Sequence, residues 1–323
     1  GRRLLPTVLK IAQKEITDRE TEAYLRFVKP FILNNSTALM GSAAAGEWAG
    51  LSYSFVGING PESRLSWFRD IYLENPVEAS LPIFERVFRE VLKPWYGQPK
   101  WEKVHLYRDH DPQRMFPDIL ATAHREMGID ADHATIHCHY LQEDLPNPLY
   151  FLKHVYPDRL REAKLWYTAV THGDLNLQNI LLDERENIYI IDFSETGHRN
   201  ITADFARLEP IFKIELTRIS SEQDVHDLLI FEKKLLETKS LQERPENAYP
   251  GDDPQVEKAY KFICKLREYA NQVTIFEDDI KPYLLAMLEW TLPVICYVNV
   301  DAPGKKFALF SSALICRRLL KKD

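Results

Sequence analysis

The stretch that decides the fold is THGDLNLQNILLDERENIYIIDFSETGHRNITADFAR, residues 171–207. It opens with a histidine, a glycine and Asp174, and Asn179 follows five residues later. Two short apolar runs around a polar turn then predict a β-hairpin, after which Asp192 precedes a phenylalanine. Because the second strand of a hairpin returns to where the first began, we expect Asp192 to lie beside Asp174 and Asn179.

Two carboxylates and an amide at one end of a hairpin suit phosphoryl transfer from ATP. The reaction needs a carboxylate that orients the acceptor hydroxyl and takes its proton, and oxygen ligands for the Mg²⁺ that bridges the phosphates. We assign Asp174 as the base, and Asn179 and Asp192 as the metal ligands. A lone His-x-Asp is an ordinary polar turn, but here the positions agree in order with a hairpin between them.

The spacing matches the kinase pattern H-R-D-x-x-x-x-N followed by D-F-G, with Gly173 in place of the arginine and Ser194 in place of the last glycine. In this form it resembles the aminoglycoside phosphotransferase and choline kinase-like family and, less closely, kinase-like domains of bacterial conflict systems. The resemblance implies that His172 braces the loop. It also implies that Asp204 hydrogen-bonds the catalytic loop, although a helix cap explains Asp204 equally well and both roles are compatible.

The resemblance also predicts a lysine that bonds the nucleotide phosphates. Lys10 stands in TVLKIA, a short β-branched run that predicts a strand. Its partner in the following helix would be Glu20 or Glu22. We prefer Glu20, because the glutamate of this family lies early in that helix. The ordinary alternatives are an edge-strand lysine and glutamates on a solvated helix face.

The adenine-binding hinge of such a fold is expected after SYSFVG, at Phe55, Gly57 and Asn59. The glycine-containing loop that covers the phosphates belongs to two strands before the lysine strand, yet only nine residues precede Lys10. Glycine is scarce as well, with 12 among 323 residues. We expect a small lobe that is truncated at its N-terminus. Either the protein continues upstream, which we prefer because a chain that starts at an inner strand leaves an unpaired edge, or it lacks these strands. The low glycine count reflects this truncation in part and the helical C-terminal half more.

The resemblance implies an α+β, bilobal protein-kinase-like fold with a small β-rich lobe and a large helical C-lobe. Residues 1–60 would form the partial small lobe: lysine strand, helix, two strands and hinge. Residues 61–323 would form the C-lobe, with the catalytic loop at 171–194. After Asp204 nearly all of the chain is expected to be helical, and Asp253 before a proline is typical of an N-cap. Helical spacing also predicts helices at 16–32, 80–96, 116–128 and 148–170.

Composition excludes several classes of protein. Hydrophobic residues make up 45% and charged residues 28% of the chain, which provides a sizeable core and argues against disorder. The net charge of −7 argues against a nucleic-acid-binding surface over the whole molecule. Four widely spaced cysteines suit reduced thiols, and no segment has the pattern of a signal peptide or a bilayer span. We expect a cytoplasmic protein that binds neither nucleic acid nor membrane.

Two further groups of residues have ordinary explanations that we prefer. The histidines at 133, 137 and 139 suggest metal ligation, but no set of four ligands at zinc spacing accompanies them. The acidic runs 251–253 and 277–279 suggest contacts with a cationic acceptor. Helix capping explains these runs more simply.

The predicted function is ATP- and Mg²⁺-dependent transfer of the γ-phosphoryl group to a hydroxyl of a small molecule. The partners are then a nucleotide and a small-molecule acceptor of unspecified class, with an upstream domain or partner protein beside them. The alternative is a nucleotide-binding pseudokinase that serves as a switch or scaffold in a larger assembly, which the missing phosphate loop favours. A protein kinase is disfavoured because Asp204 follows Asp192 by only twelve residues, leaving little room for an activation loop.

Overall fold

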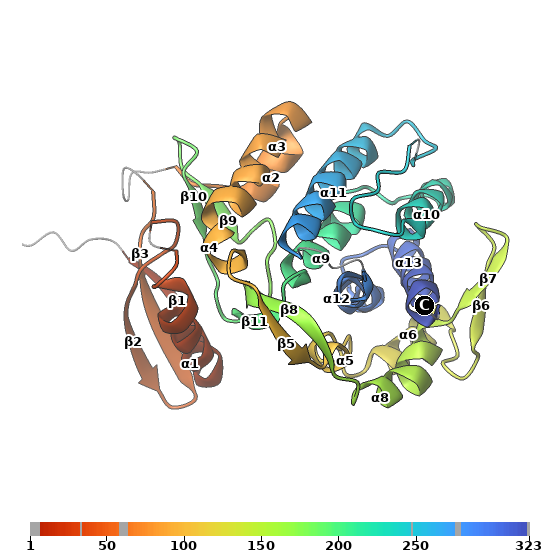
Figure 1. Cartoon of the computed structure of the whole chain (residues 1–323), viewed down its shortest axis with the longest axis horizontal. Helices are drawn as coiled ribbons and strands as arrows, with labels where there is room; N and C mark the ends of the chain where they lie inside the picture. The colour runs from red at the N-terminus through yellow and green to blue at the C-terminus, as the bar shows by residue number, and fades with distance from the viewer. Residues whose placement is uncertain (1–6, 33, 58–63, 247, 275–278, 322–323) are drawn as a thin grey trace, which may run out of the picture. The chain divides into compact units, whose positions relative to one another are not determined.

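The structure is a computed structural model that describes most of the chain: residues 7–32, 34–57, 64–246, 248–274 and 279–321. The expected mixed α+β class is confirmed (Figure 1). The chain forms two compact units, the first comprising Gly1–Lys100 with Thr168–Asp204 and the second Trp101–Tyr167 with Phe205–Asp323. The division into lobes at residue 60 stays a prediction.

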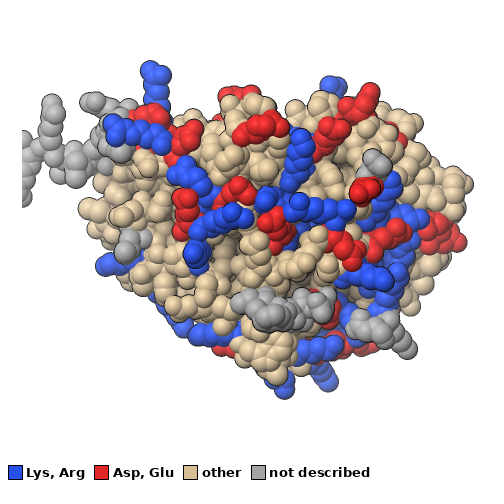
Figure 2. Space-filling view, turned by 45° about the horizontal axis from the view of Figure 1, so that its top comes forward, with Lys and Arg blue, Asp and Glu red and all other residues tan. Residues whose placement is uncertain are grey.

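The surface carries both signs of charge. On the face shown in Figure 2, Lys and Arg side chains alternate with Asp and Glu side chains and do not gather into a single basic area. No described helix combines the length and the apolar character that crossing a bilayer requires.

The first unit contains an antiparallel sheet that carries a helix on one face. Strand β3 (Trp48–Ser54) lies between β1 (Thr7–Gln13) and β2 (Leu39–Ala45). Helix α1 (Lys14–Ala23) follows β1 directly and continues as the π-helix η1 (Tyr24–Val28). The expected strand, helix, strand, strand order is therefore present.

The register of this sheet decides which side chains face α1. Lys10 pairs with Leu51, and residues two apart on a strand share a face. Leu51 and Tyr53 are buried, whereas Leu9 and Ile11, on the opposite face of β1, are 62% and 65% exposed. Lys10 therefore points toward the buried, helix-covered face of the sheet.

The second sheet contains the predicted hairpin. Strands β9 (Ile180–Leu182) and β10 (Ile188–Ile190) pair antiparallel, and β4 (Ser66–Trp67) adds to β9. Asp183 closes the turn, because its Oδ1 accepts hydrogen bonds from the backbone N–H groups of residues 185 and 187. The unit also contains the helices α2 (Phe68–Glu74), α3 (Val77–Arg86), η3 (Val87–Val91) and α4 (Lys93–Tyr96).

One predicted helix is wrong in its second half. Residues 148–170 are helical only as far as α8 (Tyr156–Arg159), and β8 (Lys164–Thr171) is a strand that pairs antiparallel with β11 (Gly197–Asn200). The run AVT within β8 is buried on both sides. A continuous apolar run of this kind does not distinguish a buried strand from a helix by its periodicity.

The second unit is mainly helical, as expected. Asp253 caps α11 by accepting a hydrogen bond from the backbone N–H of Gln255. The strands of this part are β5 (Lys100–Val104), β6 (Thr135–Cys138) and β7 (Glu143–Pro146). The helices are α5 (Leu106–Asp109), α6 (Ile119–Met127), α7 (Pro148–Tyr150), η4 (Phe151–Val155), α9 (Ala203–Pro210), η5 (Ile211–Glu215), α10 (Glu222–Glu237), α11 (Pro254–Val273), α12 (Lys281–Thr291), η6 (Leu292–Cys296) and α13 (Ala302–Leu320).

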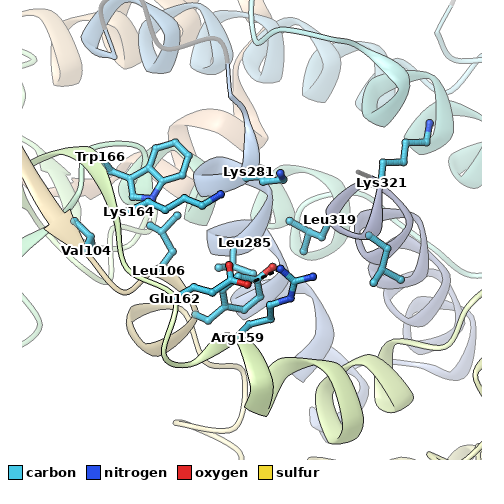
Figure 3. A pocket seen from close by; sticks show the side chains of 12 residues that line it. Val104, Leu106, Arg159, Glu162, Lys164, Trp166, Lys281, Leu285, Leu319 and Lys321 are labelled. Carbon is cyan, nitrogen blue, oxygen red and sulfur yellow. Dashed lines mark hydrogen bonds and ion pairs between the residues drawn. The ribbon is translucent and has the colours of Figure 1, made fainter. Parts of the chain in front are cut away.

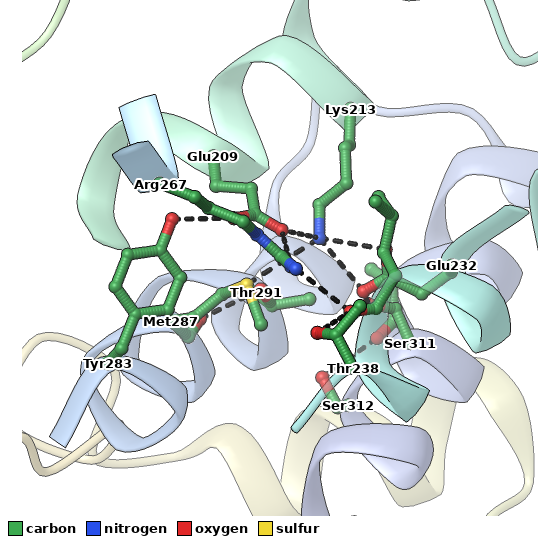
Figure 4. A network of polar contacts seen from close by, with 12 residues as sticks. Glu209, Lys213, Glu232, Thr238, Arg267, Tyr283, Met287, Thr291, Ser311 and Ser312 are labelled. Atoms are coloured by element: carbon green, nitrogen blue, oxygen red, sulfur yellow. Dashed lines mark hydrogen bonds and ion pairs between the residues drawn. The ribbon is translucent and has the colours of Figure 1, made fainter. Parts of the chain in front are cut away.

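The core of these helices holds a charged network (Figure 4). Lys213 Nζ lies 3.0 Å from Glu209 Oε1 and 2.8 Å from both carboxylate oxygens of Glu232. Arg267 donates two further bonds to Glu209, at 2.7 and 2.8 Å. Two buried cations, Lys213 and Arg267, are thus neutralised by two buried carboxylates. Burial opposes ionisation of Glu209, but the charges of Arg267 and Lys213 hold its pKa far below the usual range.

Replacing Lys213 tests this network. Lys213→Met removes the cation that two buried carboxylates share, and uncompensated buried charges are strongly destabilising. We expect the free energy of unfolding at pH 7 to fall by about 3–5 kcal/mol in urea titrations. The pKa of Glu209 is lower in the folded than in the unfolded protein. Its ionised carboxylate therefore stabilises the fold fully at pH values above the unfolded pKa, and this stabilisation is lost as the pH falls toward the folded pKa.

The matched control is Lys239→Met, at an exposed lysine of the same unit, which should change stability by no more than about 0.5 kcal/mol. Equal stability of the two variants would contradict a structural role for the network.

Candidate active site

Asp204 holds the loop that follows β8. Its carboxylate, only 1% exposed, accepts hydrogen bonds from the backbone N–H groups of His172 at 2.7 Å and Gly173 at 2.9 Å. The Tyr96 hydroxyl donates to the same carboxylate at 2.8 Å. Asp204 lies in the first turn of α9, so the start of this helix is tied directly to the loop.

His172 braces the loop from inside. Its Nε2 lies 3.0 Å from the carbonyl oxygen of Ile191, directly before Asp192. The His172 ring packs against Phe193 with centroids 5.7 Å apart, and Phe193 in turn packs against Tyr24 of η1. The residues on either side of Asp192 are thus fixed to the loop that follows β8.

Gly173 occupies a position that only glycine fits. Its φ is +84°, in the left-handed region, and a Cβ built there would lie 2.1 Å from the carbonyl oxygen of Glu195. Any larger residue at position 173 would push this loop away from the backbone of Glu195. This close approach explains why the chain has glycine where the kinase pattern has arginine.

Asn179 lies against Asp174, as the hairpin predicts. Its Nδ2 donates to the carbonyl oxygen of Asp174 at 3.0 Å, which turns Oδ1, the atom that would ligate a metal, away from that carbonyl. The backbone N–H of Ile191 donates to the carbonyl of Asn179 at 3.1 Å. Asn176 supports the turn, because its Oδ1 accepts from the backbone N–H groups of residues 178 and 179.

Lys10 lies between two carboxylates from distant parts of the chain. Its Nζ is 2.6 Å from Glu20 Oε2 and 2.7 Å from Asp192 Oδ1. Glu20 is 1% exposed and its other oxygen accepts from the Tyr53 hydroxyl at 2.7 Å. Glu22 is exposed on α1. Of the two glutamates that the sequence leaves open, Glu20 is therefore the one that bonds Lys10.

The charges of this triad stabilise one another. Partial burial opposes the charged forms of Lys10 and Asp192, but the hydrogen bonds and charges between them outweigh it. The pKa of Lys10 is therefore raised and that of Asp192 lowered from their ordinary values. Burial and the neighbouring Glu20 raise the pKa of Tyr53, which keeps its hydroxyl protonated as a donor. Lys10 and Asp192 are therefore both charged near neutral pH, and Tyr53 is protonated.

Asp192 also adopts an unusual backbone conformation. Its φ is +62°, in the left-handed region that residues other than glycine seldom adopt. The Ser194 hydroxyl donates to Asp192 Oδ1 at 3.0 Å. The Asp192 side chain remains 43% exposed, so a ligand can reach it.

The predicted hinge is described in part. Phe55 and Gly57 follow β3, whereas Asn59 lies outside the described residues. Phe55 is half-buried, and the backbone of Gly57 hydrogen-bonds the Tyr189 hydroxyl. Contact with adenine stays a prediction for all three residues.

The donor set suits Mg²⁺ better than a metal held by protein alone. In the part of the chain that the structure describes, no three or more His, Cys, Asp or Glu side chains form a cluster that could hold a metal. His137 instead lies 2.8 Å from Asp144. Mg²⁺ is usually bound through one or two protein oxygens, with waters and phosphates completing the shell. The carboxylate of Asp192 and the amide oxygen of Asn179 fit that requirement.

Sequence reasoning missed the two tyrosines that support this site. Tyr53 orients Glu20, and Tyr96 orients Asp204. Tyr53 could have been found, because it lies two residues from Leu51 and shares the face of the sheet that Lys10 occupies. Tyr96 carries no comparable signal, since its partner is 108 residues away in the sequence.

A family model described as "Ternary complex associated domain 9" matches residues 1–144 and 121–283. No curated protein matches the chain. Among solved structures, a thermostable mutant of aminoglycoside phosphotransferase APH(4)-Ia, in a ternary complex with ADP and hygromycin B, is 13% identical, with a TM-score of 0.46 over 98% of this chain and 88% of the other.

A second mutant of that enzyme, with AMP-PNP and hygromycin B, is 13% identical, with a TM-score of 0.45 over 98% of this chain and 87% of the other. Choline kinase LicA from Streptococcus pneumoniae is 11% identical, with a TM-score of 0.38 over 96% of this chain and 86% of the other. These likenesses are distant, so the site is assigned from its own geometry.

Substituting Gly173 should disrupt the loop. In Gly173→Ala the new methyl group meets the Glu195 carbonyl, and the positive φ adds strain, so we expect the free energy of unfolding to fall by about 1–3 kcal/mol. Gly197→Ala is the matched control, because the same methyl group there has nothing within 4 Å. Denaturant titrations of both variants check this, and equal losses would contradict the close approach at Gly173.

Removing Lys10 should reveal the lowered pKa of Asp192. Lys10→Met deprives Glu20 and Asp192 of a charged hydrogen bond each, and we expect a loss of roughly 1–3 kcal/mol in stability at pH 7. A carboxyl with a lowered folded pKa stabilises fully above its unfolded pKa of about 4 and loses that contribution as the pH falls through the folded value. The difference from wild type should therefore shrink below about pH 4.

The control for that measurement is Lys14→Met, at an exposed lysine on α1. Urea titrations of the three proteins from pH 7 to pH 3 give the comparison. A difference between Lys10→Met and wild type that stays constant over this range would rule out coupling to a carboxylate.

Proposed function

The chain belongs to the ternary complex associated domain 9 family, and we propose that it is an ATP- and Mg²⁺-dependent phosphotransferase with a small-molecule hydroxyl as acceptor. The observation that carries the proposal is the position of Lys10 Nζ, 2.6 Å from Glu20 and 2.7 Å from Asp192. An ammonium group held by a helix glutamate is how kinases position a cation for the phosphates.

Each remaining group has a role that its position supports. Asp174 orients the acceptor hydroxyl and takes its proton as that oxygen bonds to the γ-phosphorus. The bond from this phosphorus to the β,γ-bridging oxygen breaks, and ADP leaves. Asn179 and Asp192 offer oxygen ligands, and Lys10 offers a cation to the phosphate oxygens. Bound magnesium would neutralise negative charge that develops during transfer. Asp204 keeps Asp174 in place by fixing the two residues before it.

The contact between Lys10 and Asp192 keeps both side chains charged. Lys10 lowers the pKa of Asp192, so the carboxylate is charged and ready to accept a metal at neutral pH. The same bond means that a metal must share Asp192 with the ammonium group or displace it. We further propose that Phe55, Gly57 and Asn59 form the adenine hinge, within a small lobe of residues 1–60.

A nucleotide-binding pseudokinase is the second candidate. The family's description associates this domain with a ternary complex, which favours a role inside an assembly. The contact between Lys10 and Asp192 also favours it, because nucleotide and metal could act by switching this contact. Both candidate functions use the same nucleotide site, and only the phosphotransferase would transfer the phosphoryl group.

The test is the substitution Asp174→Asn. It removes the proton acceptor while leaving Lys10, Asn179 and Asp192 in place. We expect the rate of phosphoryl transfer from Mg²⁺-ATP, followed by phosphorus NMR across a panel of hydroxyl acceptors, to fall by about 10²–10⁴-fold. Nucleotide affinity, measured by calorimetry, should remain within about twofold, since the Asn179 amide bonds the backbone carbonyl of Asp174, which the substitution leaves unchanged.

Asp18→Asn, at an exposed aspartate on α1, is the control and should leave both quantities unchanged. Tight nucleotide binding by the wild type without turnover on any acceptor would reject the enzyme and support the pseudokinase. Absence of nucleotide binding would reject both candidates.

A further inference from the structure

A cavity lies entirely within the second unit, and none of its residues belongs to the candidate active site (Figure 3). Its volume is about 380 Å³, which is within the range of small-molecule sites. Strand β8 contributes one wall, and the first turns of α12 and the end of α13 contribute others. Its apolar floor is buried and consists of Val104, Leu106, Trp166, Leu285 and Leu319.

The rim of this cavity is cationic. Four basic side chains line it together with a single carboxylate, which gives the lining a net charge of +3; they are Arg159, Lys164, Lys281, Lys321 and Glu162. The carboxylate is engaged, because Glu162 Oε1 lies 2.5 Å from Arg159 Nη1. Asp279 is nearby at the start of α12, but it accepts a hydrogen bond from the backbone N–H of Lys281.

This concentration of positive charge is notable in a chain whose net charge is −7. An apolar pocket bordered by one sign of charge focuses the electrostatic potential and attracts ligands of the opposite sign. Lysine stems also cover apolar surface in many proteins, so positive charge at the rim has an ordinary explanation. The enclosed floor beneath it distinguishes this site, because Trp166 and Leu285 offer an apolar body somewhere to bind.

We propose that this cavity binds a small amphiphilic anion. The apolar body of the ligand lies on Trp166, Leu285 and Leu319. Its anionic group, a carboxylate or a phosphate monoester, lies between Lys164 and Lys281. A small apolar site with a few convergent polar groups at its mouth selects for this combination. The proposal is independent of the nucleotide site and stands or falls without it.

Calorimetry on the full chain tests the proposal with four probes: octanoate, octyl phosphate, 1-octanol and inorganic phosphate. We expect octanoate and octyl phosphate to bind at one site with a negative heat-capacity change, the mark of buried apolar surface. The two anions differ only in the headgroup, so their relative affinities identify which anion the lysines prefer. Inorganic phosphate should bind weakly or not at all, since it has no apolar body.

The rim is tested with the double variant Lys164→Glu/Lys281→Glu and the single variant Lys164→Glu. Reversing charge at the mouth should weaken octanoate binding by at least about tenfold and leave 1-octanol unaffected. Lys239→Glu, which makes the same change at an exposed site outside the cavity, should alter affinity by less than about twofold. The melting temperature of each variant shows whether it is folded, and the single variant serves if the double variant is not.

Three results would overturn the proposal. The first is no binding of either octyl anion. The second is equal affinity of the wild type for 1-octanol and octanoate, because the lysines would then contribute nothing. The third is an equal loss of affinity in Lys239→Glu and Lys164→Glu, which would assign the effect to overall charge.

Discussion

One ammonium group, shared by two carboxylates, is the interaction on which the first unit depends. Glu20 is buried, and a buried carboxylate without a cation is strongly unfavourable. Lys10 therefore has to stay on the α1 side of its strand, which sets the register of β1 against β3. Asp192 must reach the same point from the end of β10, and it does so with a backbone conformation that L-residues rarely adopt. The positions of a strand, a helix and a hairpin are thus coupled through a single nitrogen atom.

The sequence predicts the parts of this arrangement that depend on local spacing. Asn179 precedes the first of two apolar runs, and Asp192 follows the second. A hairpin formed by these runs brings their outer ends together, so the pattern predicts that Asn179 and Asp192 lie close to each other. The N-cap at Asp253 is similarly local, because it needs only the preceding and following residues. The preference for Glu20 over Glu22 came from a family resemblance, and the geometry explains it, since Glu20 lies on the buried side of α1 and Glu22 faces solvent.

The remaining features depend on contacts between distant residues and have no local signal. The need for glycine at position 173 comes from the carbonyl of Glu195, twenty-two residues later. The strand nature of β8 comes from its pairing with β11, because its apolar run alone is compatible with a helix. Tyr96 looks like an ordinary core aromatic until Asp204 is placed beside its hydroxyl.

The first unit is also discontinuous, which has a consequence for how the protein is made. Lys10 and Asp192 are separated by 182 positions, and residues 101–167 of the other unit are synthesised between them. At 5–20 residues per second, a ribosome needs roughly 10–40 s to reach Asp192 after Lys10 has emerged. Throughout that interval the nascent β1–α1–β2–β3 segment carries Glu20 and Lys10 without their third partner, Asp192. Early folding of this segment therefore depends on its own sheet pairing, and the loop after β8 can close only once Asp204 has been synthesised.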